Sequence, residues 1–150
     1  MELLAPGITK LQLDWQTHAT ELIDLEGKKV LIIDDDLIDP DAVSQVLSSF
    51  GINTTVAQSA ERAYELIREI DQPELILSDF RLSEQTNGIE LIRNLRKLTG
   101  LSALPGLIVT GETSPDKLSY IESTQIPCLH KPVNMDDLIK TMQKLFSDNA

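Results

Sequence analysis

Four apolar runs of this sequence end in polar side chains that could do chemistry. In chain order, these residues are Asp34, Asp35 and Asp36, then Asp79, then Thr110, and then Lys131 before a proline. An aspartate carboxylate is a competent nucleophile for phosphoryl transfer. Carboxylates, a hydroxyl and an ammonium group can hold a cation and the oxygens of the transferring group. The residue types therefore suggest phosphoryl transfer to Asp79, provided that the fold brings them together.

The three adjoining aspartates suggest a cation. Carboxylates that share a site repel one another, which raises their proton affinity unless a cation compensates. Oxygen ligands from two strands, with positions left for water and phosphate, suit Mg2+ better than Ca2+. We therefore expect Asp34 and Asp35 to hold Mg2+, while a solvated loop or helix N-cap fits Asp36 better. The alternatives are a solvated loop for all three and a simple turn at Asp79.

The elements that must position these residues alternate over residues 28–146. Runs that are apolar on both faces predict parallel strands covered by helices on both sides. Strands are expected at residues 30–33, 53–57, 75–78, 107–110 and 126–129, and helices at 37–50, 60–70, 87–98, 114–123 and from 134 onward. Ser59 and Asn134 are candidate N-caps, and Gly51 and Gly100 are candidate helix stops.

This alternation predicts an α/β fold. A flavodoxin-like (βα)5 doubly wound parallel sheet, in strand order 2-1-3-4-5, suits five units in this length. In such sheets, ligands bind beyond the carboxyl ends of the strands, where the strand order reverses. Residues as far apart as Asp34 and Lys131 should therefore converge on one crevice.

Composition excludes other classes of function. The chain has 150 residues and a net charge of −11, which argues against a nucleic-acid surface because such a surface needs basic residues. No apolar run approaches the roughly 18 residues of a membrane span, and no secretory signal is visible. The single cysteine, Cys128, excludes an internal disulfide and is expected to be a small buried filler. We expect a cytoplasmic protein.

The motifs resemble the receiver domain of two-component response regulators over about residues 28–147. The resemblance rests on VLIIDDD (30–36), LILSDFRL (75–82), NGIELIRNLR (87–96), LIVTGETSP (107–115) and LHKP (129–132), in the family's order and spacing. It implies these roles: Mg2+ ligands at Asp34, Asp35, Asp79 and the backbone carbonyl of Arg81, phosphorylation at Asp79, a switch hydroxyl at Thr110 and a phosphate-sensing Lys131. It also implies a cis peptide bond between Lys131 and Pro132.

Three features depart from the family's usual pattern. Cys128 stands where the switch aromatic usually lies, three residues before the lysine, so the usual signal relay lacks its ring. The loop after Asp79 lacks the common Met-Pro pair and is similar to receivers attached to hybrid sensor kinases. Arg81 and Glu112 occupy positions that flank the path of the hydrolytic water in the family. A salt bridge between them could shield an aspartyl phosphate, and the alternative is two solvated charges.

The resemblance implies a phosphoacceptor of a phosphorelay, with at most self-phosphorylation and autodephosphorylation activity. The expected donor is a sensor histidine kinase or a histidine phosphotransfer protein. The expected contact face for a downstream protein comprises the helix at 114–123, the strand at 126–129 and the last helix. A degenerate receiver, acting as a phosphorylation-independent interaction module, is the alternative.

Two other functions are disfavoured. An aspartyl phosphohydrolase would carry an acid two residues after its nucleophile, where this chain has Arg81. A flavodoxin would carry a Ser/Thr/Gly loop after the first strand, where this chain has three acids.

Residues 1–27 lie outside the repeat. Their apolar residues are Leu3, Leu4, Ile8, Leu11, Leu13, Trp15, Leu22, Ile23 and Leu25. We expect this extension to dock on the domain or on a second copy, which would make a homodimer, or to be a linker from a longer protein. Residues 148–150 are expected to be a short tail.

Overall fold

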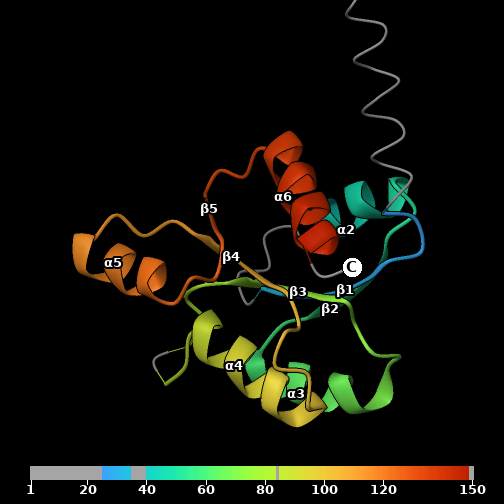
Figure 1. The fold of residues 1–150 in the computed structure, drawn as a ribbon, viewed down its shortest axis with the longest axis horizontal. Coiled ribbons are helices and arrows are strands. Elements are labelled where there is room, and N and C mark those ends of the chain that lie inside the picture. Colours follow the sequence, from blue (N-terminus) through green and yellow to red (C-terminus); the bar gives the residue numbers. More distant parts are fainter. Residues whose placement is uncertain (1–24, 35–39, 84, 149–150) are drawn as a thin grey trace, which may run out of the picture.

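A single parallel sheet forms the centre of the fold (Figure 1). The computed structural model describes residues 25–34, 40–83 and 85–148. The strands are β1 (Lys29–Ile33), β2 (Asn53–Ala57), β3 (Leu75–Asp79), β4 (Gly106–Thr110) and β5 (Cys128–His130). Their order is β2-β1-β3-β4-β5, which confirms the predicted topology.

Helices cover both faces of this sheet. The described helices are α2 (Pro40–Ser49), α3 (Ala60–Glu69), α4 (Gly88–Thr99), α5 (Pro115–Ser123) and α6 (Met135–Asp148). Figure 1 shows α2 and α6 on one face and α3 and α4 on the other, with α5 to one side near β5. The α/β class and the doubly wound arrangement predicted from the sequence are thus confirmed.

Two apolar cores follow from the alternation of side chains along the strands. Leu31 and Ile76 belong to the core under α3 and α4, whereas Ile32 and Leu77 belong to the core under α2 and α6. All five residues of β3 are buried, as expected for a strand with a neighbour on each side and helices on both faces. The phosphoacceptor candidate, Asp79, is therefore the last residue of the most central strand.

Helix boundaries follow local capping chemistry. The Ser59 hydroxyl accepts a hydrogen bond from the backbone N–H of Arg62 at 3.0 Å, and the Asn134 amide oxygen accepts one from Asp136 at 2.8 Å. Gly100 ends α4 in the left-handed conformation, with φ of 73°. These three predicted caps and stops are confirmed. The predicted start of the first helix, residues 37–39, lies outside the described residues.

The predicted bounds of the last strand were wrong. The strand runs over Cys128–His130 rather than 126–129. Gln125 adopts a positive φ of 62°, and the backbone N–H of Ile126 lies 3.3 Å from the Thr124 hydroxyl, so the chain is still in a turn there. Ile126 is nevertheless buried in the core, and its apolar side chain suggested a strand that its backbone does not form.

The end of the N-terminal extension packs against the domain. Leu25 is fully buried with Leu47 and Ile52, and the backbone N–H of Gly27 donates to the Gly51 carbonyl at 2.8 Å. The expected docking of residues 1–24 lies outside the described residues. Among the described helices, none has the length and apolar character that crossing a membrane requires.

Candidate functional site

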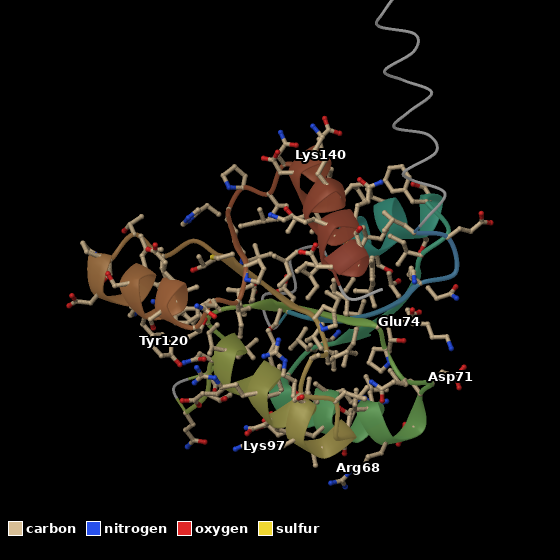
Figure 2. The ribbon with its side chains drawn as sticks, in the orientation of Figure 1. Arg68, Asp71, Glu74, Lys97, Tyr120 and Lys140 are labelled. Carbon is tan, nitrogen blue, oxygen red and sulfur yellow. The ribbon has the colours of Figure 1, made fainter. Side chains whose placement is uncertain are left out.

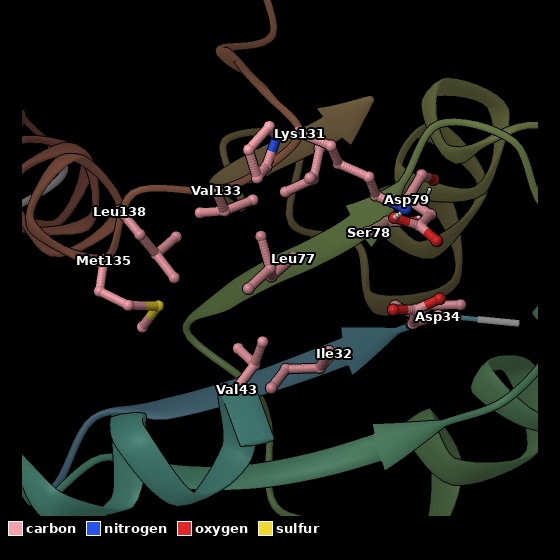
Figure 3. A pocket seen from close by; sticks show the side chains of 13 residues that line it. Ile32, Asp34, Val43, Leu77, Ser78, Asp79, Lys131, Val133, Met135 and Leu138 are labelled. Carbon is pink, nitrogen blue, oxygen red and sulfur yellow. Dashed lines mark hydrogen bonds and ion pairs between the residues drawn. The ribbon is translucent and has the colours of Figure 1, made fainter. Parts of the chain in front are cut away.

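The carboxyl ends of the central strands bring four of the predicted site residues together. Asp34 directly follows β1, Asp79 ends β3 and Thr110 ends β4. Lys131 follows β5, and its backbone N–H donates to the Thr110 carbonyl at 2.9 Å. Figure 3 shows Asp34 and Asp79 at neighbouring strand ends, with the Lys131 side chain directed toward Asp79.

An ion pair joins Lys131 to Asp79. The Lys131 Nζ lies 2.9 Å from the Asp79 Oδ1, and the Asp79 side chain is only 8% exposed. A charged hydrogen bond of this length is a strong one. The pair therefore orients one carboxylate oxygen of Asp79 and places an ammonium group where a group attached to that carboxylate would lie.

The Asp79 carboxyl holds its proton unusually tightly. Burial is the largest cause, followed by the hydrogen bond with Asp34, and together they raise the pKa of Asp79 from 3.8 to about 7 against the opposing effect of Lys131. An apolar cavity of about 330 Å3 adjoins the site and contributes to this environment. Its lining includes Val43, Leu77 and Leu138 (Figure 3). The single positive charge of Lys131 does not balance the charge of two carboxylates, Asp34 and Asp79, in this largely apolar site.

This arrangement fits a divalent cation. Carboxylate oxygens are hard ligands of the kind that Mg2+ prefers. A cation between Asp34 and Asp79 would offset both the burial of the Asp79 charge, which is the main cause of its raised pKa, and the smaller effect of Asp34. Within the described residues, no group of three or more acidic, histidine or cysteine side chains is placed to hold a metal. Asp35, the third predicted acidic ligand, lies outside them.

Gly88 is a site residue that sequence reasoning missed. A Cβ atom on Gly88 would lie 2.2 Å from the Asp79 backbone oxygen and 2.7 Å from Ile108 Cδ1. The backbone N–H of Gly88 donates to the Phe80 carbonyl at 2.7 Å, which holds the start of α4 against the end of β3. The Asn87-Gly88 pair suggested only a helix start. The close approach depends on α4 crossing β3 and leaves no local signal beyond the glycine itself.

A second cavity also adjoins Asp79. It has a volume of about 360 Å3 and is lined by Asp79, Arg81, Val109, Thr110, Gly111, Glu112 and Lys131. The Thr110 hydroxyl is buried and accepts a hydrogen bond from the Glu112 backbone N–H at 2.9 Å. That hydroxyl retains its own hydrogen for a further acceptor, such as a phosphoryl oxygen.

An ion pair at the rim of this cavity confirms one of the two alternatives for Arg81 and Glu112. The Arg81 Nη2 lies 2.6 Å from the Glu112 Oε1, and the Lys117 Nζ lies 3.5 Å from the same oxygen. The hydrogen bond from Arg81, with a smaller contribution from Lys117, holds the pKa of Glu112 below its usual value. The two charges, which both line this cavity, are therefore paired.

The residues before Lys131 include Cys128, which stands where the family usually has the switch aromatic. Cys128 is half-buried against the core, and burial raises the pKa of its thiol, as expected for a filler. His130 is exposed. The Lys131–Pro132 peptide bond is cis, which confirms what the resemblance implied.

The comparisons with known proteins give one family. The family described as "Response regulator receiver domain" matches residues 30–143. The two-component response regulator ORR11 of Oryza sativa subsp. indica is 27% identical over 117 residues, covering 77% of this chain and 79% of that protein. The transcriptional regulatory protein ZraR of Escherichia coli is 29% identical over 116 residues, which cover 77% of this chain but 25% of ZraR.

Solved structures of response regulators are similar to this chain as well. The Vibrio cholerae chemotaxis protein CheY4 is 28% identical, with a TM-score of 0.68, and the match covers 79% of this chain and 98% of CheY4. The fold and the matched family define a signalling domain of two-component systems. The chain belongs to the response regulator receiver domain family. Receivers interact with histidine kinases or phosphotransfer proteins and generally bind Mg2+ at their phosphorylation site.

Proposed function

We propose that this chain accepts a phosphoryl group on Asp79 from a phosphohistidine donor and signals through protein contact. The observation that carries the proposal is the buried Asp79 carboxylate, paired with Lys131 at 2.9 Å and adjoining Asp34. A donor of this kind belongs to a sensor histidine kinase or a histidine phosphotransfer protein. A cytoplasmic location is part of the proposal and agrees with the single cysteine.

The transfer exchanges the P–N bond of the donor for a P–O bond to Asp79. A carboxylate oxygen of Asp79 attacks the phosphorus, the P–N bond to the donor imidazole breaks, and the imidazole nitrogen keeps the electron pair and takes up a proton. The product is an aspartyl phosphate. Because the transition state is loose, the protein contributes mainly position and charge neutralisation.

The chain's own residues divide this work. Lys131 holds one oxygen of Asp79 beforehand and would take a phosphoryl oxygen afterwards, and the Thr110 hydroxyl would donate to another. The residues that we propose as Mg2+ ligands are Asp34, Asp35, Asp79 and, through its backbone carbonyl, Arg81. When bound, Mg2+ supplies neutralisation of the charge on the transferring group.

Loss of the phosphoryl group to water is the second reaction. Water attacks the phosphorus, the P–O bond to Asp79 breaks, and inorganic phosphate leaves while the carboxylate is restored and a proton is released. The ion pair between Arg81 and Glu112 spans one side of the cavity beside Asp79. We propose that the Arg81 and Glu112 side chains, which both line this cavity, hinder the approach of water and so prolong the life of the aspartyl phosphate.

The surface that carries the signal is proposed to comprise α5, β5 and α6. Tyr120 on α5 and Lys140 on α6 lie on the outside of the domain (Figure 2). We also propose that the receiver spans residues 28–147, with a short tail after it. The buried Leu25 belongs to the extension before it, and a second copy of the chain is a candidate partner for that extension.

Acetyl phosphate tests the proposal without a cognate kinase. With Mg2+, the wild-type chain should gain the mass of one phosphoryl group, and Asp79→Asn should gain none. Lys28→Ala, which removes an ion pair with Glu74 away from the site, should behave as wild type. No mass gain at any Mg2+ concentration would instead favour a degenerate receiver that acts without phosphorylation.

A further inference from the structure

Glu112 connects three parts of the molecule through its side chain and backbone. Its carboxylate pairs with Arg81, from the loop after β3, and with Lys117, from the first turn of α5. Its backbone N–H donates to the Thr110 hydroxyl at 2.9 Å. Since Arg81 lies two residues after Asp79, one glutamate links the loop of the phosphoacceptor, the hydroxyl at the end of β4 and α5.

The two side chains of the ion pair between Arg81 and Glu112 differ in their exposure to solvent. The Arg81 side chain is 73% exposed, whereas that of Glu112 is 12% exposed. Both residues line the cavity that also contains Asp79. When the balance of charge in that cavity changes, the arginine can swing toward a new anion while the glutamate stays in place.

Helix α5 has few other attachments within the described chain. Ile121 is its only buried residue, whereas α4 buries five residues: Gly88, Ile89, Leu91, Ile92 and Leu95. The Ser114 side chain makes no capping hydrogen bond at the start of α5. The Tyr120 ring contacts Phe80 with the ring centroids 6.3 Å apart. The contact of Lys117 with Glu112 is therefore one of the few side-chain contacts that hold the first turn of α5.

We propose that a phosphoryl group on Asp79 draws Arg81 away from Glu112 and thereby loosens α5. This inference rests on the proposed function. It gives the receiver a relay that does not need an aromatic ring at position 128.

Charge and geometry both favour this exchange. Phosphorylation replaces a carboxylate of charge −1 by a group of charge about −2. The planar guanidinium of Arg81 can bind two phosphoryl oxygens at once, whereas it pairs with one oxygen of Glu112. The Thr110 hydroxyl can donate to the phosphoryl group while it still accepts from Glu112. After the exchange, Glu112 keeps Lys117 alone, and the ion-pair link from α5 through Glu112 to Arg81 is lost, while the contact of Tyr120 with Phe80 remains.

Hydrogen exchange of the full chain tests the exchange of partners. Backbone amides of residues 115–123 would be followed with and without Mg2+ and beryllium fluoride, which mimics the phosphoryl group. In the wild type, the mimic should speed exchange in α5 about twofold to fivefold, as expected for loss of a surface ion pair.

Two variants should imitate the loosened state without the mimic. In Glu112→Gln, which keeps the shape of the side chain, α5 should already exchange faster, and the mimic should add little. Lys117→Met cuts the same link from the helix and should give the same result. Glu122→Gln, an exposed carboxylate of α5, is the matched control and should respond as the wild type does.

Fluorine NMR, which detects the bound mimic, distinguishes failure of this inference from failure of the proposed function. A bound mimic with unchanged exchange in α5 would overturn the inference and leave the proposed function intact. Equal responses of Glu112→Gln and the wild type would also overturn it. Absence of any bound fluoride in the wild type would overturn both.

Discussion

Asp79→Asn should stabilise the metal-free protein at neutral pH. The pKa of Asp79 is raised from 3.8 to about 7 in the folded chain, with burial as the largest cause. An acid with a raised pKa binds its proton more tightly in the folded state, so stability falls as the pH rises through this window. A neutral asparagine of the same size removes that penalty.

The magnitude follows from the same shift. About three pKa units correspond to about 4 kcal/mol at a pH above 7. The variant also loses the ion pair between Asp79 and Lys131, which offsets part of this gain. We therefore expect the variant to gain about 2 kcal/mol in the free energy of unfolding at about pH 8, and much less at about pH 4.

Urea unfolding with a metal chelator, at both pH values, measures this gain. Asp71→Asn is the control, because Asp71 lies on the outside of the domain (Figure 2) and forms an exposed ion pair with Lys29. Mg2+ in place of the chelator should stabilise the wild type more than Asp79→Asn. If the stability difference between Asp79→Asn and the wild type were the same at both pH values, the assigned electrostatics of the site would be refuted.

Three further substitutions test other parts of the account. Gly88→Ala should destabilise the fold by about 2 kcal/mol in urea unfolding, because the new Cβ would meet the Asp79 carbonyl, whereas Gly111→Ala has open space and should have little effect. Lys131→Met should weaken beryllium fluoride binding about tenfold in a fluorescence or NMR titration, and Lys140→Met, on the surface of α6, should not. Ser59→Ala should lower the free energy of unfolding by about 1 kcal/mol through loss of a cap, while Ser114→Ala, which has no such bond to lose, should not.

The sheet could be predicted because its strands carry their own burial signal. Runs such as Leu75–Leu77 are apolar on both faces, a pattern that is typical of a covered parallel strand. Once the strand order is fixed, the chain direction brings Asp34, Asp79 and Lys131 to one edge, whatever their separation in sequence. Pattern and topology together were sufficient for this part of the site.

The remaining features depend on how elements pack. Gly88 is required by the approach of α4 to β3, and Ile126 is buried by its side chain although it lies before the start of β5. The pairing of Arg81 with Glu112 was one of two alternatives, and its extension to Lys117 depends on where α5 begins. Distances of this kind are set by tertiary packing and leave no periodic signal in the sequence.

The most direct measurement identifies the residue that carries the phosphoryl group. After treatment with acetyl phosphate and Mg2+, reduction with borohydride converts an aspartyl phosphate to homoserine, which tandem mass spectrometry locates in the sequence. We predict conversion at position 79 that depends on Mg2+ and is lost in Asp34→Asn. Conversion at another aspartate, or none at position 79 in the wild type, would contradict the assignment of Asp79 as the phosphoacceptor.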